Sequence, residues 1–449
     1  MSERPAPRLL ERAGAPLQRF LELEAASTIL LLAATGVALV WANSPWAPLY
    51  EALLHVPLAL RIGPWELALG FEHFVNDALM AVFFFVVGLE IKRELAVGEL
   101  SSASRALLPV VAAAGGMVVP AGLYAAFHWD GPALRGWGIP MATDIAFAVA
   151  ALSVFGARVA PGLKVFLLAL AIADDIGAVA VIALFYTESL SMAWLGAAAA
   201  GLALVAGLGR AGVRAYGVYL AAGIGVWLAV HASGVHATIA AVALGFLTPA
   251  RPLDPPAERR GFVRRAVALL ERGGDLLEGE GDPDGHRRHD LARQVSRAAR
   301  ASLSPLDELV QRLHPVVAFV IMPVFALANA GVPIELAKLA EPLPLRVAIG
   351  VALGLVAGKP AGITLFAWLA VRLGVAELPR GVGWLQVVAT GCLAGIGFTV
   401  ALFVAALAFE APELKAGAKV GILVGSAAAT ALGVALLARA LPRQVNCGR

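Results

Sequence analysis

Long blocks of apolar residues limit most strongly what this chain can fold into. Most of them approach the roughly 20 residues that a helix needs to cross a bilayer. Within lipid, only a helix or a closed barrel satisfies its own backbone hydrogen bonds. The clearest blocks are residues 29–42, 107–127, 165–185, 193–208, 216–230, 316–330, 347–371 and 420–438. With shorter and interrupted blocks included, the sequence predicts an all-α polytopic membrane protein of about 12 transmembrane helices.

The composition excludes an ordinary soluble domain. Of the 449 residues, 59% are hydrophobic and only 15% are charged, so a soluble fold would expose much of its apolar surface. No cleavage pattern follows the first polar segment, so we expect no cleaved signal peptide. Cys392 falls inside a span and Cys447 in the tail, so we expect no disulfide. The basic pI reflects arginines in loops of one polarity, and we expect no nucleic-acid partner.

Lysine and arginine gather in every second loop, which sets the orientation of the chain. The positive-inside rule then places both termini in the cytoplasm. We expect helices 1–8 and helices 9–12 on either side of a charged cytoplasmic loop. The expected divisions are a cytoplasmic segment 1–20, helices 1–8 in 21–249, the loop 250–313, helices 9–12 in 314–439 and a cytoplasmic tail 440–449.

Two loops differ from the others. The outer stretch 56–69 (VPLALRIGPWELAL) alternates about a Gly-Pro turn and predicts a small external β-hairpin. The cytoplasmic stretch 251–303 is dense in charge, and we interpret it as a flexible connector with a short surface helix.

The block 165–185 carries two adjacent acids, Asp174 and Asp175, at its centre. A carboxylate there costs roughly 2.5–3.5 kcal/mol on insertion scales, so these residues need a function or a partner. Adjacent side chains point about 100° apart on a helix, so one structural partner cannot satisfy both.

Three more groups of polar or helix-breaking residues lie at membrane depth. Thr143 and Asp144 follow Pro140 in a block that is too short to cross unless its helix is interrupted. Lys359 lies mid-span and precedes a helix-breaking proline, Pro360. The cluster GIGFT brings Gly395, Gly397 and Thr399 to the middle of another span, where glycine permits unwound backbone.

Two distant interrupted helices indicate a transporter binding site, because half-helix ends expose backbone charge at mid-membrane. We expect Asp144 to offset N-terminal charge and Lys359 to offset C-terminal charge. Two close carboxylates in a poorly solvated site bind protons more readily and titrate as a pair. Protons and Na+ or Li+ then compete for the oxygens of Asp174 and Asp175, and Thr143 or backbone carbonyl groups would complete the ligands of the cation. Neutralising two carboxylates takes two protons, so unequal exchange is expected, with no cofactor and no enzymatic reaction.

The motifs resemble those of the NhaA-type sodium/proton antiporters. The similar stretches run in order through most of the chain: residues 75–95, ATDIAF (142–147), 169–187, SGVHAT (233–238), FALANAG (325–331), GKPAGI (358–363) and GIGFT (395–399). The resemblance implies 12 helices with inverted repeats and two crossed interrupted helices, in a bacterial inner membrane. It also implies electrogenic exchange, activation at alkaline pH, and a homodimer formed through the external hairpin.

The same resemblance assigns roles to residues. Asp174 and Asp175 are the ion and proton carriers, and Lys359 is their charge partner. The segment 76–94 resembles the region that lines the cytoplasmic entrance, with Asp77 and Glu90 as its acids. His236 and His314 match positions linked to pH response. The chain departs from the family pattern before His314, where Val310 stands in place of an acid and Asp307 and Glu308 lie in another register.

Three other classes of membrane protein fit these residues less well. An intramembrane aspartic protease needs aspartates on two facing helices, whereas Asp174 and Asp175 are adjacent on one. A channel is disfavoured because no repeated pore signature occurs. A sodium-driven symporter of a small solute remains the alternative, although few other strongly polar groups lie inside the spans.

Overall fold

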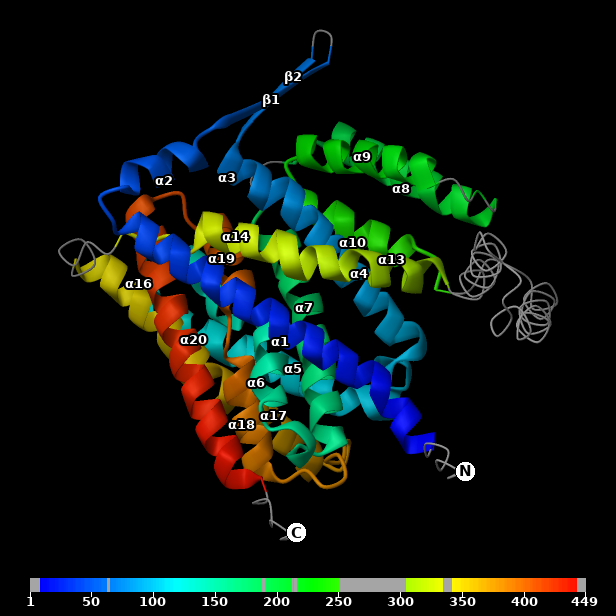
Figure 1. The fold of residues 1–449 in the computed structure, drawn as a ribbon, viewed down its shortest axis with the longest axis vertical. Coiled ribbons are helices and arrows are strands. Elements are labelled where there is room, and N and C mark those ends of the chain that lie inside the picture. Colours follow the sequence, from blue (N-terminus) through cyan, green and yellow to red (C-terminus); the bar gives the residue numbers. More distant parts are fainter. Residues whose placement is uncertain are drawn as a thin grey trace, which may run out of the picture.

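A computed structural model describes residues 9–62, 65–187, 190–211, 213, 216–250, 304–333 and 341–441. Nearly all of this part of the chain is helical (Figure 1). The connector expected at 251–303 lies outside the described residues, as does the Gly-Pro turn of the hairpin. The fold is therefore the predicted polytopic helical one.

The helices are, in chain order, α1 (Leu9–Ala42), α2 (Ala47–Leu54), α3 (Phe71–Phe74), α4 (Met80–Val97), α5 (Ala103–Phe127), α6 (Ile145–Ser153), α7 (Pro161–Phe185), α8 (Met192–Arg210), α9 (Tyr216–Ala232), α10 (Ala237–Leu247), α13 (Pro305–Val316), α14 (Met322–Asn329), α16 (Pro342–Leu353), α17 (Lys359–Arg372), α18 (Trp384–Ala394), α19 (Phe398–Ala408) and α20 (Pro412–Ala440). Short π-helical turns join some of them: η1 (Val75–Leu79), η5 (Val317–Ile321) and η6 (Gly354–Gly358). The 3-10 segments are η2 (Glu99–Ser101), η3 (Pro132–Met141) and η4 (Gly156–Arg158).

The described helices supply the spans that the apolar blocks predict. By length and composition, 8 of them can cross a membrane, and two further pairs form spans that are bent at a break. The pair in α1 and α2 bends by 116°, and the pair α18 and α19 bends by 48°. Two shorter apolar helices occupy residues 217–232 and 237–247. By these criteria the described residues hold 8 to 10 spans, and the two shorter helices would bring the number to the expected 12. The inverted repeat stays a prediction.

The hairpin and the ends of the described chain lie on opposite sides of the helices. Strands β1 (Pro57–Ile62) and β2 (Trp65–Gly70) pair antiparallel, with Ile62 opposite Trp65, as the alternating pattern predicts. Figure 1 shows the hairpin projecting at the top, whereas α1 begins and α20 ends at the bottom. Both ends of the described chain therefore lie on one side.

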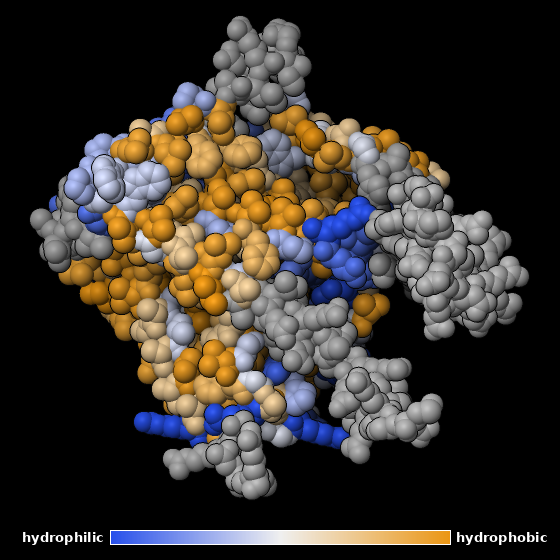
Figure 2. Space-filling model, in the orientation of Figure 1, coloured by the Kyte–Doolittle hydropathy of each residue, from blue (hydrophilic) through white to orange (hydrophobic). Residues whose placement is uncertain are grey.

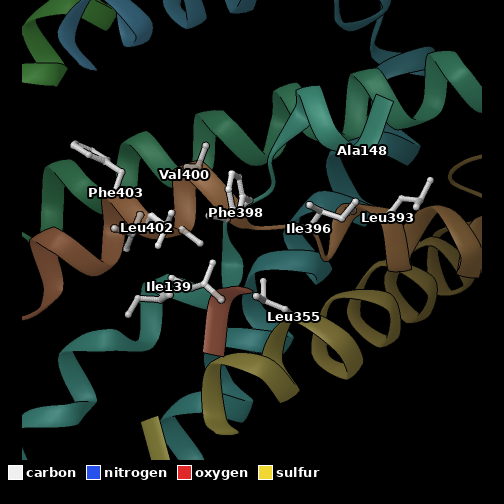
Figure 3. Packing of buried hydrophobic residues seen from close by; sticks show 14 of the residues in the cluster. Ile139, Ala148, Leu355, Leu393, Ile396, Phe398, Val400, Leu402 and Phe403 are labelled. Atoms are coloured by element: carbon white, nitrogen blue, oxygen red, sulfur yellow. The ribbon is translucent and has the colours of Figure 1, made fainter. Parts of the chain in front are cut away.

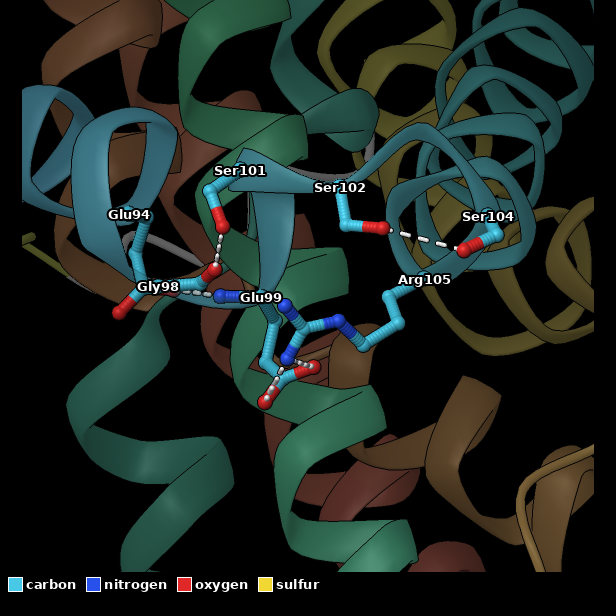
Figure 4. A network of polar contacts seen from close by, with 7 residues as sticks. All are labelled: Glu94, Gly98, Glu99, Ser101, Ser102, Ser104 and Arg105. Atoms are coloured by element: carbon cyan, nitrogen blue, oxygen red, sulfur yellow. Dashed lines mark hydrogen bonds and ion pairs between the residues drawn. The ribbon is translucent and has the colours of Figure 1, made fainter.

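The connection between α4 and α5 lies on the side opposite the hairpin and is held by polar contacts (Figure 4). Arg105 pairs with Glu99 at 3.4 Å, and both side chains are exposed. The Glu94 carboxylate accepts a hydrogen bond of 3.0 Å from the backbone N–H of Glu99. The hydroxyl of Ser101 donates to the carbonyl oxygen of Gly98. Such exposed pairs contribute little stability each, so they mainly shape the turn.

The outer surface is apolar where lipid would contact it. Figure 2 shows hydrophobic residues over most of one face, with hydrophilic residues along the lower edge and in one patch beside α13. Large side chains such as Leu184, Val40 and Ile29 are at least 70% exposed on long apolar helices. A soluble protein would not leave so much apolar area in water.

Close helix contacts at glycine place the helix that bears Lys359. A Cβ atom on Gly115 of α5 would lie 2.3 Å from the carbonyl oxygen of Gly362 of α17. In the reverse direction, a Cβ atom on Gly362 would lie 2.1 Å from the oxygen of Gly115. The two backbones touch directly, as expected for small residues in membrane helices.

The expected break at Pro360 is wrong. Helix α16 continues through η6 into α17, and Pro360 lies in the first turn of α17. Proline lacks an N–H group, and the wider hydrogen-bond spacing of the π-helical turn before it accommodates that loss. Helix α13 also begins at Pro305, inside the segment expected to be loop.

Candidate functional site

Two interrupted spans meet at their breaks. The first break separates η3 from α6 at residues 142–144, and the second separates α18 from α19 at residues 395–397. The backbone N–H of Asp144 donates to the carbonyl oxygen of Ile396 at 2.6 Å. The hydroxyl of Thr143 donates to the carbonyl oxygen of Ala394 at 2.8 Å. The interrupted helices therefore cross where the sequence predicts their breaks.

The second break is built from glycine because the backbones approach closely there. A Cβ atom on Gly395 would lie 2.3 Å from the carbonyl oxygen of Leu355. A Cβ atom on Gly397 would lie 3.2 Å from the carbonyl oxygen of Ala142. Figure 3 shows Ile396 on the extended segment between the two helices, with Leu355 nearby. Buried apolar residues surround the crossing.

Asp144 binds the N-termini of two half-helices. Its Oδ1 accepts the backbone N–H of Phe147 at 3.3 Å, which caps α6. Its Oδ2 accepts the backbone N–H of Thr399 at 3.2 Å and also the hydroxyl of Thr399. Helix N-termini carry partial positive charge, and a carboxylate there is favourable. Asp144 therefore lies where a carboxylate can offset N-terminal charge, and that role stays a prediction.

Lys359 joins the crossing to α7. Its Nζ donates to Asp174 Oδ2 at 2.6 Å, and it also donates to the hydroxyl oxygen of Thr143. Lys359 is 0% exposed and Asp174 is 1% exposed. Among the described residues, Lys359 donates no hydrogen bond to the end of α18 itself; Thr143 accepts from Lys359 and donates to the carbonyl oxygen of Ala394. Removing either partner of such a buried ion pair would leave the other charge buried and unpaired, which is strongly destabilising.

The remaining oxygens of the two aspartates have no protein donor among the described residues. Asp174 Oδ1 is buried and has no hydrogen-bond partner in this part of the chain. Asp175 is 8% exposed, and no described residue donates a hydrogen bond to its carboxylate. Such oxygens are hard ligands that suit a small cation. Within the ranges that the structure describes, no group of three or more His, Cys, Asp or Glu side chains could hold a resident metal ion.

The expected pH-response residues form two separate pairs. His314 Nδ1 lies 3.3 Å from Glu90 Oε1, and both side chains are about one-fifth exposed. His236 lies within electrostatic range of Asp77 and contacts the ring of Phe403. Asp77 lies in η1 near the hairpin, about 20 Å along the helix from Glu90 at 1.5 Å per residue. The structure does not bring Asp77 to the level of Glu90.

Asp307 and Glu308, the acids near Val310, make side-chain contacts within α13 and its N-cap. Val310 itself is buried against Leu89 and Leu306. Asp307 accepts a hydrogen bond of 2.6 Å from the hydroxyl of Ser304, which caps α13. Glu308 pairs with Arg312 at 2.6 Å. Apolar packing therefore occupies the position where the resemblance leads one to expect an acid.

Two contributions to the site and its surroundings are not predicted by the sequence. The hydroxyl of Ser426 on α20 accepts hydrogen bonds from the backbone of the second break. Lys92, which the sequence indicates only as an ordinary basic helix end, donates to the carbonyl oxygens of Phe246 and Thr248 at the end of α10. Ser426 stands alone in a run of small residues, and nothing in its spacing indicates its partner.

Comparison with known proteins gives the family. The family model described as Na+/H+ antiporter 1 matches residues 18–437. The chain is 48% identical to the Na(+)/H(+) antiporter NhaA 2 of Myxococcus xanthus, over 96% of this chain and 91% of that protein. It is 49% identical to the Na(+)/H(+) antiporter NhaA of Rhodopirellula baltica, over 97% and 96% respectively. A third relative, Na(+)/H(+) antiporter NhaA 2 of Sorangium cellulosum, is 49% identical over 94% and 89%. This chain, with its crossed helix breaks and paired aspartates, belongs to the Na+/H+ antiporter 1 family.

Proposed function

We propose that this protein is an electrogenic sodium/proton antiporter of the bacterial inner membrane. It exports Na+ or Li+ in exchange for protons and so contributes to pH and sodium homeostasis. The family and the names of its relatives support the exchange of these two ions. The shared site consists of Asp174 and Asp175, with Thr143 beside them.

One observation carries this proposal. Asp174 offers one oxygen to Lys359 and keeps the other without a partner, while Asp175 beside it lacks a protein donor among the described residues. The site is therefore charged, buried and incompletely bonded. A small cation or protons would complete it, and both use the same oxygens.

Exchange follows from that competition. In the proton-loaded state, Asp175 holds a proton, and Lys359 is an ammonium paired with Asp174. When Na+ enters, it binds Asp174 and Asp175, and the ammonium loses its partner. Lysine changes its protonation readily when buried, so Lys359 releases its proton. Two protons then leave for each Na+ bound, one from Asp175 and one from Lys359, and each cycle moves net charge.

Alternating access completes the cycle. The site faces one side of the membrane at a time, and it reorients only when loaded with Na+ or with protons. The crossing is suited to such a change because Thr143 and Asp144 hold the two breaks by hydrogen bonds rather than by continuous helix. Both ends of the described chain lie on one side, which agrees with cytoplasmic termini and an external hairpin. We propose a homodimer formed through that hairpin.

Transport by purified protein in liposomes tests the proposal. A pH gradient is imposed, and its dissipation is followed after adding Na+, Li+ or K+, with the voltage clamped and unclamped. Na+ and Li+ should dissipate the gradient, and an opposing voltage should slow the exchange. Proton movement that requires an added organic solute would instead indicate a symporter. Cation-induced proton movement at a rate that does not depend on the membrane voltage would contradict electrogenic exchange.

A further inference from the structure

We propose that Ser426 on α20 is a positioning residue for ion exchange, because its hydroxyl holds the N-terminus of α19 at the helix break. The inference rests on the proposed function and adds a residue to it. Ser426 is 5% exposed and lies outside the two interrupted spans. Its Oγ accepts the backbone N–H groups of Gly397 and Phe398, each at 3.3 Å.

Ser426 and Asp144 together bind three amides at the start of α19. The first N–H groups of any helix have no partner within it. Gly397 occupies the N-cap position of α19 and has no side chain with which to cap it. Ser426 takes the amides of Gly397 and Phe398, and Asp144 takes the next amide, that of Thr399. Three successive amides are thus bound by side chains from two other elements.

Helix α20 is suited to act as a fixed anchor. Its glycines lie directly against the backbone of α16: a Cβ atom on Gly421 would meet the carbonyl oxygen of Ala348 at 2.5 Å. A Cβ atom on Gly425, the neighbour of Ser426, would meet Cα of Ala352 at 3.0 Å. Helix α16 continues through η6 into α17, which begins with Lys359. Ser426 therefore ties the start of α19 to the helix that carries the lysine.

The charge at the break gives Ser426 its effect on transport. Its oxygen accepts from two amide groups, and the positive ends of their dipoles point toward the crossing. Without that oxygen, the uncompensated amides would add positive potential near Asp144 and the aspartate pair. Such potential disfavours Na+ and favours the ionised carboxylates. Loss of Ser426 should therefore raise the KM for Na+ and move the pH profile of exchange to lower pH.

Three substitutions separate the hydrogen bonds from the volume of the side chain. Ser426→Ala removes the acceptor, Ser426→Cys keeps a similar volume with a weak acceptor, and Ser426→Thr keeps the oxygen. The matched control is Thr430→Ala, one turn later on α20, whose hydroxyl donates along its own helix to the carbonyl oxygen of Ser426 at 2.7 Å. All four variants are compared with the unchanged protein in liposomes.

We expect the alanine and cysteine variants to raise the KM for Na+ roughly threefold to tenfold, a change of about 1 kcal/mol for loss of the shared acceptor of two buried amides. Their half-maximal activity should fall at lower pH. Ser426→Thr and Thr430→Ala should keep both values. Hydrogen exchange measured by mass spectrometry should be faster over residues 395–403 in the alanine and cysteine variants alone. If the alanine variant does not fold, the cysteine and threonine variants carry the comparison.

Two results would overturn the inference. One is an unchanged KM and pH profile in Ser426→Cys together with faster amide exchange, which would leave Ser426 a structural cap only. The other is a cysteine variant that matches the unchanged protein in every measurement. If the unchanged protein itself exchanged no Na+ for protons, the proposed function would fail instead, and the amide exchange would still report whether Ser426 holds α19.

Discussion

Lys359 on α17 and Asp174 on α7 form an ion pair of 2.6 Å inside the membrane part of the protein. The lysine is fully buried, and its second partner is the hydroxyl of Thr143 at the first helix break. The aspartate keeps one oxygen without a partner among the described residues. The same ammonium thus contacts the proposed site of exchange and the crossing of the interrupted helices. A change in the protonation or the partner of Lys359 would therefore alter the contacts of the aspartate and of the crossing.

Replacing either carboxylate by its amide tests the shared site. Asp174→Asn and Asp175→Asn should each abolish Na+-driven proton movement while the protein still inserts and folds. The reason is that each residue supplies charge that its neighbour cannot replace. Asp130→Asn, an equal change at an exposed loop position, is the matched control and should transport normally. Exchange at the unchanged rate in either site variant would show that the pair is not the carrier.

Asp144→Asn tests the charge at the crossing. The amide retains one oxygen but turns an NH2 group toward one of the backbone donors that the carboxylate now accepts from, at Phe147 or Thr399. We expect a loss of about 1–3 kcal/mol in the free energy of unfolding, since a buried donor is left unpaired. Thermal unfolding in detergent and the KM for Na+ are the measurements. A variant that melts like the unchanged protein would show that the helix ends need no charged acceptor.

The sequence predicts the spans and the two breaks because both depend on local composition. Thr143 and Asp144 lie too close to the end of an apolar block for an unbroken helix to cross the membrane. Gly395 and Gly397 permit unwound backbone in the middle of another block. The hairpin follows from its alternating pattern in the same way. These features require no knowledge of which helices become neighbours.

The partners inside the site depend on helix rotation and packing, which one sequence does not reveal. By sequence, the adjacent aspartates are equally good partners for Lys359, and only the rotation of α7 selects Asp174. Pro360 indicates a break by its chemistry, but the π-helical turn before it keeps the helix continuous. Ser426 lies 28 positions from Phe398, so its role emerges only from the packed structure.

Because α5 and α17 are in direct contact, adding a single methyl group between them should strongly lower stability. Gly115→Ala would force its Cβ toward an oxygen that lies 2.3 Å away, so the two helices must separate. Overpacking of this kind costs about 1–3 kcal/mol, and it should also raise the KM for Na+ because Gly362 lies one turn after Lys359. Gly122→Ala on the same helix meets nothing within 4 Å and is the control. The test compares melting temperature and KM; equal values for both variants would contradict the packing argument.

Substitution of Lys359 separates two roles for the buried ammonium. If the lysine carries one of the two exchanged protons, Lys359→Gln should leave a folded protein whose exchange no longer responds to voltage. If it only balances charge, Lys359→Gln should weaken folding and Na+ affinity while exchange remains voltage-sensitive. Lys359→Arg retains positive charge but cannot release a proton, so it should preserve the balancing role alone. The measurement is the rate of Na+-driven proton movement in liposomes under clamped voltages of either sign. We expect the carrier result, because the ammonium loses its carboxylate contact, Asp174, when Na+ takes that oxygen. Voltage-sensitive exchange in a folded glutamine variant would exclude it.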